Sequence, residues 1–507
     1  MEYSSVQLND LPDEIIFIIF KKLNKLDVLY SFINVNTRFN NIVHDPTFTS
    51  GLTLFNYLSY DYIYPLSDLI LERFCLQILP KIARQIKWLD LEPLSMKRIF
   101  LSANYPNLFR LGIYYIKKQA ALNLFTDKTS VMHRLKNDIL SFTINTINTQ
   151  QGASINLDTL VFTHIFNMFT NLQYFNFDPF FLCYQRISFG SSPPTVFSST
   201  LLELHVKVMY IQDCLYLLDD KEKLPKLRCF SLSCRLSLYC YDTIIIPLLH
   251  RMSNLEQLSL YLSHVHRNRF INGNDLKQNI VDYLPELNQF RFNIHSTMLL
   301  NNEINLPSNE DIQHTFKDFF NNEIISCVNY FLGDNEGECL IYSYPYTLRH
   351  YYKIANNFPG GLFPCVHEVS LFDEHPFEHE FFIRIQRSFP FMKRLIINNR
   401  KAQKEKQCKK LKNINQDLLV IEYSHLQCLI LNEAHYDYVE QFLLDTKTRL
   451  PYGVDLFVDY KPLKRVTYNF KRDATQINCS KVRYICSDTN FRFPKHFKDY
   501  FLDIDTS

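Results

Sequence analysis

The string "HPFEH", residues 375 to 379, holds side chains whose types and spacing could do chemistry. His375 and His379 are four positions apart, so on a helix both imidazoles would lie on one face and could share a zinc ion. Glu378 could then act as the base that activates a zinc-bound water. The string therefore raises the hypothesis of a zinc-dependent hydrolase.

The residues around this string favour a structural role. It directly follows the apolar stretch "VHEVSLF" and leads into "FFIRIQRSFP", where a helix is expected. Pro376 is compatible with a helix only if the helix begins there. The string resembles the H-x-x-E-H motif of inverted zinc peptidases, and a zinc peptidase is kept as a remote alternative.

Glycine and cysteine usage argues against a phosphate-binding loop and against a cysteine-based zinc site. The 507 residues include only 10 glycines, and only Gly360 and Gly361 are adjacent, so the chain lacks the clustered glycines of phosphate-binding loops. The 13 cysteines form no C-x-x-C pair, and the closest set, Cys229, Cys234 and Cys240, has a spacing that suits no common zinc site. We therefore expect no cofactor, no metal, and reduced thiols in the cytoplasm or nucleus.

Charge and length also restrict the function. The net charge of +2 gives no general affinity for polyanions, so nucleic acid is not an expected partner. Residues 1 to 20 contain no Lys or Arg and the first apolar run is short, so neither a signal peptide nor a membrane span is expected. A chain of 507 residues predicts several domains or one repeat array.

One short pattern recurs along the chain: an aliphatic residue, two residues, an apolar residue, one residue, an apolar residue. Its copies begin at Leu108, Leu172, Leu201, Leu227, Leu255, Leu287, Val366, Met392, Leu426 and, less cleanly, near Val482. The alternation predicts a short strand, and stretches such as 210–220 and 435–445 have helical apolar spacing. One strand and one helix cannot bury their own faces, so the units are expected to stack into a curved solenoid.

The array resembles the leucine-rich-repeat family, but irregularly, because the Asn or Cys expected after each strand is mostly missing. A generic α/β protein is the alternative. Residues 296–362 break the pattern, and "FLGDNEGECLIY" within them predicts a hairpin. The run 400–413 is rich in Lys and predicts a solvated loop. The C-terminal stretch predicts a last strand and an amphipathic helix.

The stretch "LPDEIIFIIFKKL" begins at Leu11, and its residues 15–20 are all apolar. On a helix, six consecutive apolar residues cover every side, so both faces need a cover. Three short helices are predicted at about 12–23, 26–34 and 36–44, with Asn24, Asp27 and Asn36 at breaks or caps and with Asp10 able to cap the first. Such a small unit cannot bury the whole first helix, so a partner is expected.

Residues 8–48 resemble the F-box family through a Leu-Pro followed by an acidic residue, an apolar first helix, and a closing Asp45-Pro46. They depart from it at Asn36-Thr37 and at Phe39, where Trp is frequent. The resemblance implies a helical module that binds a Skp-type linker, which joins a cullin, while the rest of the chain holds a protein substrate. The residues implied to contact the linker are Leu11, Pro12, Ile15, Ile16, Ile19, Phe20, Leu23, Leu29, Val35 and Phe39.

The sequence thus predicts an α/β fold with a three-helix F-box at 1–50 and an irregular leucine-rich-repeat-like solenoid at 51–507. The function expected is a non-catalytic substrate adapter of a cullin-RING, SCF-type ubiquitin ligase. Two alternatives are a repeat scaffold without a ligase role, and a helical module that only caps the solenoid. If the strands line a hollow, their outward residues are candidates for substrate contact. They include His205, Gln257, Tyr261, Arg291, Glu368, Phe372 and Arg394.

Overall fold

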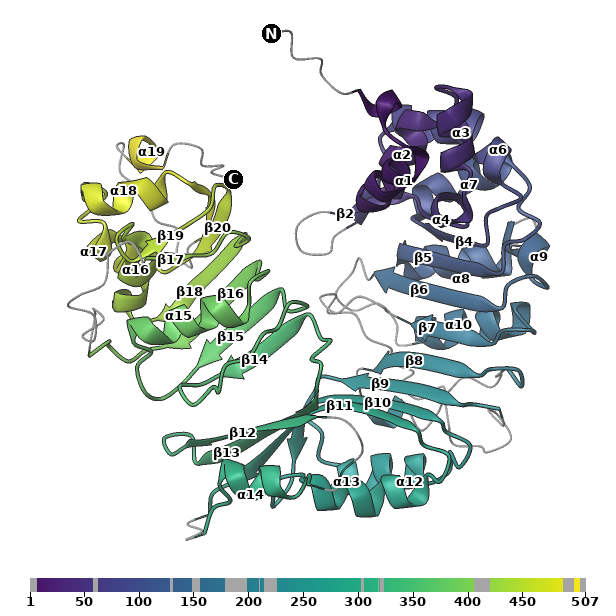
Figure 1. Ribbon diagram of the computed structural model, residues 1–507. Helices are drawn as coiled ribbons and strands as arrows, with labels where there is room; N and C mark the ends of the chain where they lie inside the picture. The colour runs from purple at the N-terminus through teal and green to yellow at the C-terminus, as the bar shows by residue number, and fades with distance from the viewer. Residues whose placement is uncertain are drawn as a thin grey trace. The chain divides into compact units, whose positions relative to one another are not determined.

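The computed structural model (Figure 1) describes residues 7–57, 63–127, 131–147, 156–177, 198–208, 210–213, 226–301, 305–317, 319, 323–404, 420–486 and 497–501. The chain divides into two compact units. Unit 1 comprises residues 1–265 and 275–292, and unit 2 comprises residues 266–274 and 293–507.

Unit 1 begins with a group of short helices. They are η1 (Leu8–Asp10), α1 (Asp13–Lys22), α2 (Lys25–Phe32), α3 (Thr37–Val43) and α4 (Pro46–Thr49). The side chains of Asn24 and Asn36 cap α2 and α3 by accepting hydrogen bonds from the amides of Leu26 and Phe39. The three predicted helices and these two caps are confirmed, whereas Asp27, predicted at a break or cap, lies inside the first turn of α2. Asp10 instead accepts from the Gln7 amide, so its predicted role as the cap of α1 is wrong.

The rest of unit 1 is built on parallel strands that pair in chain order: β1, β4, β5, β6, β7, β8, β9, β10 and the first part of β11 (Figure 1). Their bounds are β1 (Gly51–Thr53), β4 (Trp88–Leu91), β5 (Arg110–Lys117), β6 (Ser141–Ile147), β7 (Tyr174–Phe177), β8 (Glu203–Val208), β9 (Cys229–Cys234), β10 (Gln257–His266) and β11 (Gln289–Leu299). A separate antiparallel pair joins β2 (Phe55–Tyr57) to β3 (Ile63–Pro65).

Each sheet face follows from the alternation of the sequence. One residue from each of β1 and β4 to β10 forms a core row in register, at most 1% exposed. This row is Leu52, Leu89, Leu111, Phe142, Phe175, Leu204, Phe230 and Leu258. The residues one position earlier form an outer row on the opposite face, where side chains are largely polar and half-buried or exposed. The outer row is Gly51, Trp88, Arg110, Ser141, Tyr174, Glu203, Cys229 and Gln257.

Consecutive strands are joined by one repeated hydrogen-bond arrangement. The carbonyl just before one strand accepts hydrogen bonds from two successive amides at the start of the next strand. For example, the Lys87 carbonyl accepts from the amides of Phe109 (3.0 Å) and Arg110 (3.2 Å). The same arrangement occurs at the carbonyls of Ser50, Phe109, Leu140, Gln173, Leu202, Arg228 and Glu256. A backbone bond therefore fixes the strand starts where the sequence lacks the expected Asn or Cys.

Helices fill the connections of unit 1, and α8 packs on β5 and β6. The helices are α5 (Asp68–Arg73), η3 (Phe74–Ile78), α6 (Leu79–Ile82), α7 (Pro93–Ser102), α8 (Lys118–Thr126), α9 (Val131–Leu135), α10 (Asn156–Met168), η4 (Tyr241–Ile245), α12 (Ile246–Leu249), α13 (Gly273–Asn279) and η5 (Val281–Tyr283). The helix predicted at 210–220 falls largely on residues 214–220, outside the described residues.

Unit 2 contains an antiparallel hairpin and a parallel sheet. The hairpin, β12 (Ile324–Phe331) and β13 (Glu336–Ser343), pairs with the second part of β11, which confirms the predicted hairpin. The parallel sheet has the order β14 (His350–Ile354), β15 (Glu368–Phe372), β16 (Arg394–Asn399), β18 (Cys428–Ala434), β20 (Val454–Phe457) and β21 (Val482–Cys486). A short parallel pair joins β17 (Ile421–Glu422) to β19 (Thr448–Arg449).

The helices of unit 2 lie between these strands. They are α14 (Asn309–His314), α15 (His379–Ser388), α16 (Tyr436–Leu443), α17 (Tyr460–Val466), α18 (Asp473–Cys479) and α19 (Phe497–Tyr500). Helix α16, which packs on β18, confirms the helix predicted at 435–445. Strand β21 confirms the predicted last strand. Of the predicted basic loop at 400–413, residues 405–413 lie outside the described part.

Every predicted copy of the repeat lies at an observed strand. In all but the last, the strand begins two residues after the first aliphatic residue, as for Leu108 and β5 or Leu426 and β18. The fold is therefore of mixed α/β content, with an N-terminal helical module.

Candidate functional site

Helix α1 has one face that the chain itself covers. Ile16 is 0% exposed and Phe20 is 1% exposed. The ring of Phe20 lies 4.3 Å from the ring of Phe32, 6.1 Å from Phe39 and 6.3 Å from Phe48, measured between centroids. These aromatic rings form the core of the helical module, so the inner face of α1 needs no partner.

The opposite face of α1 carries an exposed apolar stripe. Ile15 is 43% exposed, Ile18 55% and Ile19 36%. Their spacing of three and four residues places them together along one side of the helix. Contiguous exposed aliphatic side chains on a soluble protein mark an interaction surface. We call Ile15, Ile18 and Ile19 the exposed stripe.

The module packs on the sheet through α2 and leaves the exposed stripe uncovered. Helix α2 contacts β1 and η3. The Tyr30 ring lies 6.5 Å from the Phe74 ring, and the guanidinium of Arg73 lies 4.5 Å from the centroid of Tyr30. Both α2 and α4 contact β1, and these contacts do not account for the outer face of α1.

The segment before α1 is held by Arg38 of α3. The Arg38 Nε atom lies 2.5 Å from Asp13 Oδ1, Nη1 donates to the Asn9 carbonyl at 2.5 Å, and Nη2 donates to the Leu11 carbonyl. Three donors of the Arg38 guanidinium thus hold residues 9–13, which lead into α1. No local pattern in the sequence marks this role, because Arg38 lies 25 residues from Asp13.

The residues implied to contact a linker separate into two groups. Ile16, Phe20, Leu29 and Phe39 are buried within the chain, so they support the module rather than offering a surface. The others remain at least partly accessible: Leu11, Pro12, Ile15, Ile19, Leu23 and Val35. Ile18, which sequence reasoning did not single out, belongs with them. Because residues 15–20 are all apolar, the sequence shows no alternation of apolar and polar residues that could have separated buried from accessible positions.

The residues predicted for substrate contact are also unequal in exposure. Gln257 and Arg291 are exposed, whereas His205, Tyr261, Phe372 and Arg394 are half-buried. Glu368 is buried and accepts a hydrogen bond from the Tyr352 hydroxyl at 3.2 Å, so the structure contradicts its predicted accessibility.

Phe372 packs edge-on against Phe331, with 5.1 Å between their centroids. The first four residues of the set, from His205 to Arg291, lie in unit 1, and the last three lie in unit 2.

The "HPFEH" string does not form a helical metal motif. Helix α15 begins at His379, so His375 lies before the helix, which makes the predicted pair on one helix face wrong. The buried His379 Nδ1 lies 3.1 Å from Gln441 Oε1, and Glu378 accepts from the Lys404 amide at 3.0 Å. The imidazole of His375 is directed at Asp373 instead. These contacts give the string a structural role in joining loops.

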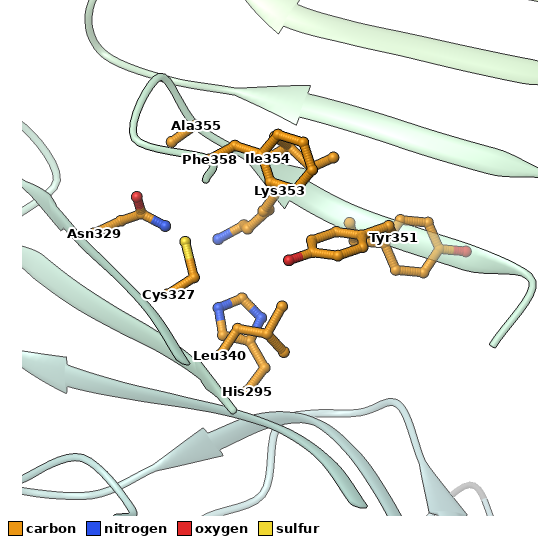
Figure 2. A pocket seen from close by; sticks show the side chains of 10 residues that line it. His295, Cys327, Asn329, Leu340, Tyr351, Lys353, Ile354, Ala355 and Phe358 are labelled. Atoms are coloured by element: carbon orange, nitrogen blue, oxygen red, sulfur yellow. The ribbon is translucent and has the colours of Figure 1, made fainter. Parts of the chain in front are cut away.

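A small pocket in unit 2 contains polar side chains (Figure 2). Its lining residues are His295, Cys327, Asn329, Leu340, Tyr351, Tyr352, Lys353, Ile354, Ala355 and Phe358. Its empty volume is about 280 Å³ with its open mouth included, below the usual size of a ligand site. Burial raises the pKa of the Cys327 thiol to about 11, so this cysteine is not an activated nucleophile.

Two lining residues of this pocket, His295 and Lys353, form a charge cluster with the buried Glu338. His295 Nε2 lies 3.0 Å from Glu338 Oε2, and Lys353 donates to Glu338 Oε1. Figure 2 shows the side chains of His295 and Lys353 directed toward one another. The cluster joins β11, β13 and β14, and loss of one partner would leave a buried charge uncompensated.

Comparison with known protein families identifies an F-box domain at residues 8–50. At the family level, an F-box domain implies a substrate adapter of an SCF-type ubiquitin ligase, and F-box domains bind Skp-type linkers within such complexes. The search of curated proteins finds no match to this chain. Among the helices in the described ranges, none is long and apolar enough to cross a membrane.

Proposed function

We propose that this chain is the substrate-recognition adapter of a cullin-RING ubiquitin ligase of the SCF type. In this proposal the F-box binds a Skp-type linker, and the linker joins the cullin. The chain itself carries out no covalent step. The observation that carries the proposal is the exposed stripe on α1, which lies within the F-box match and is left uncovered by the packing of α2.

The parallel strands are proposed to form an irregular leucine-rich-repeat-like solenoid over residues 51–507 that holds a protein substrate. Support comes from the chain-order pairing of the strands and from the repeated shared carbonyl. The outer row offers polar and aromatic side chains in half-buried positions, a mixture that suits a protein surface better than a phosphate backbone.

The linker proposal is tested with a double variant, Ile15→Asp with Ile19→Asp, in the full chain. Charges in the centre of an apolar interface remove a hot spot of about 2 kcal/mol or more, so the dissociation constant should rise at least about 30-fold. Isothermal titration with a purified Skp-type linker measures this change. Linker binding as tight as in the unmodified chain would show that α1 does not contact the linker.

Two control variants separate binding from folding. Leu94→Asp places the same charge on another exposed apolar position, in α7, and should bind the linker normally. Ile16→Ala removes a buried core side chain and should lower the unfolding free energy by about 2 to 5 kcal/mol without touching the interface. If the unmodified chain itself binds no linker, the repeat scaffold without a ligase role replaces the adapter.

The substrate surface is tested by affinity purification and mass spectrometry. Gln257→Lys and Arg291→Glu change the charge at two exposed outer positions of unit 1. We expect these variants to lose bound substrate and to retain the linker. Unchanged recovery of every bound protein would place the substrate surface elsewhere.

A further inference from the structure

Three side chains with different metal-binding atoms meet on the outer face of unit 1. Glu203 and His205 are two positions apart on β8, so they point to the same face. Cys229 begins β9 and is the register partner of Glu203. A carboxylate oxygen of Glu203, a ring nitrogen of His205 and the Cys229 sulfur all lie within 4.8 Å of one another. Parallel pairing thus joins residues that are far apart in the sequence.

The imidazole and the thiol of this cluster have few or long hydrogen bonds. His205 Nε2 is buried and makes no hydrogen bond within the described residues, although Glu203 Oε2 lies 3.6 Å away. The Cys229 thiol has a long contact of 3.9 Å to Gln257 Oε1. A buried ring nitrogen without a hydrogen bond is costly unless a further group binds there.

The imidazole lies between an aromatic ring and exposed polar side chains. The Tyr174 ring lies 5.1 Å from the His205 ring, and the Tyr174 hydroxyl accepts a hydrogen bond from Asn176 at 3.2 Å. Glu203 and Gln257 on the other side are exposed. Burial lowers the pKa of His205, and the nearby charge of Glu203 opposes this shift.

We propose that Glu203, His205 and Cys229 form a zinc-binding site on the outer face of the unit 1 sheet. Nitrogen, sulfur and oxygen donors together are typical of Zn²⁺, whereas a thiolate does not suit Mg²⁺ or Ca²⁺. Tetrahedral zinc with bonds of about 2.0 to 2.3 Å holds its ligand atoms about 3.3 to 3.6 Å apart. Glu203 Oε2 and His205 Nε2 already lie 3.6 Å apart, and the Cys229 sulfur, within 4.8 Å of the other ligand atoms, requires a shift of at most about 1 Å. Three protein ligands leave a fourth position open.

The Cys229 thiol must lose its proton when the ion binds. Burial raises the pKa of Cys229 to about 11, the charge of Glu203 adds to this, and Arg291 opposes it. A bound zinc ion overrides this environment, since coordination deprotonates a thiol outright. The site is independent of the adapter role, because none of its ligands lies in the F-box.

Zinc titration of the full chain, after treatment with a chelator, tests the proposal. We expect one equivalent of tightly bound Zn²⁺. Loss of a direct ligand should weaken binding at least as much as loss of a supporting group, so His205→Ala and Cys229→Ser should each reduce the affinity by at least about tenfold. With Co²⁺ as the probe, the unmodified chain should show a thiolate-to-cobalt charge-transfer band, and Cys229→Ser should lose it.

A cysteine outside the cluster provides the matched control. Cys240 is also half-buried, and Cys240→Ser should keep both the zinc stoichiometry and the cobalt band. The proposal is overturned if the unmodified chain binds no zinc, or if Cys229→Ser and His205→Ala bind it as tightly as the unmodified chain. Circular dichroism of each variant confirms that the fold is kept. Linker binding should be the same in all of them.

Discussion

At the scale of single residues, Glu338 has the most strongly constrained charge in unit 2. Its side chain is 1% exposed and contacts both His295 and Lys353. Burial raises the pKa of Glu338, but the charges and hydrogen bonds of His295 and Lys353 lower it by more. The net result is a pKa lowered from 4.5 to about 2. The carboxylate therefore remains ionised far below neutral pH, which makes folding of this unit dependent on pH.

The sign of this dependence follows from the lowered pKa. The stabilisation is fully present above pH 4.5 and is lost as the pH falls through about 2. We expect Glu338→Gln to lower the unfolding free energy of unit 2 by about 3 kcal/mol at pH 7 and by less than half of that at pH 3. Urea denaturation of both proteins at the two pH values measures the difference.

An exposed ion pair serves as the control for Glu338. Glu422 and Arg449 lie 2.9 Å apart, and both side chains are about half exposed. Glu422→Gln should change the unfolding free energy by less than about 1 kcal/mol at either pH. A Glu338→Gln effect that stays constant between pH 7 and pH 3 would contradict the assigned role of the carboxylate.

The zinc proposal also shows what the spacing between cysteines along the sequence cannot predict. From the sequence, the cysteines were judged by their distance from one another, and no metal was expected. Cys229 has instead a histidine and a glutamate of the preceding strand as neighbours. The repeat itself gives the register that joins them, because Glu203 and Cys229 are each the third residue of their copies, which begin at Leu201 and Leu227.

At the scale of elements, Gly51 and Trp88 form the first step of the sheet. They are register partners on β1 and β4, and a Cβ atom on Gly51 would lie 1.7 Å from Trp88 Cε2. The amine of Lys25 and the guanidinium of Arg110 lie 5.7 Å and 5.5 Å from the centre of the indole. The indole thus links α2 of the F-box to the sheet through cation and ring contacts.

We expect Gly51→Ala to displace the Trp88 indole and lower the unfolding free energy by about 1 to 3 kcal/mol. Trp88 is the single tryptophan of the chain, so its fluorescence emission should shift to longer wavelength as the ring becomes exposed. Gly453→Ala, in unit 2, should leave the emission unchanged, although its positive φ makes that variant strained. Unchanged emission in Gly51→Ala would show that the Trp88 indole does not pack directly against Gly51.

Most strands could be predicted from the sequence because the repeat leaves an alternating pattern. Two strands that were not predicted, β4 and β6, follow the same pattern in "IKWLDL" from Ile86 and "ILSFTI" from Ile139, so the pattern alone could have found them. Strand β20 differs, since Gly453 stands where the copy at Leu426 has its first aliphatic residue. The inner and outer faces of α1 were not predictable, because only the aromatic cluster around Phe20 distinguishes them.

At the scale of the whole molecule, the two compact units should unfold as separate transitions. Phe230 belongs to the core row of unit 1, and Leu429 is fully buried in unit 2. Phe230→Ala and Leu429→Ala should each remove about 2 to 5 kcal/mol from its own unit. Differential scanning calorimetry should show each variant shifting a different transition. A single transition displaced equally by both variants would mean that the units do not unfold independently.

The F-box and the first strands belong to the same unit, while the sequence placed a domain boundary at residue 50. That boundary remains a prediction. The contacts of α2 with β1 and η3 give the physical reason why the module and the sheet would be stabilised together.

The paired amides that share one carbonyl have a practical consequence for engineering this chain. Each strand of unit 1 from β4 to β11 is anchored at its first residues, so the segment that leads to it can change length without moving the register downstream. A reporter peptide or a small fluorescent protein could therefore be inserted at the exposed residues 253–254, in the turn before β10, without altering the neighbouring strands. The same anchoring would allow one strand and its following connection to be exchanged as a unit for another.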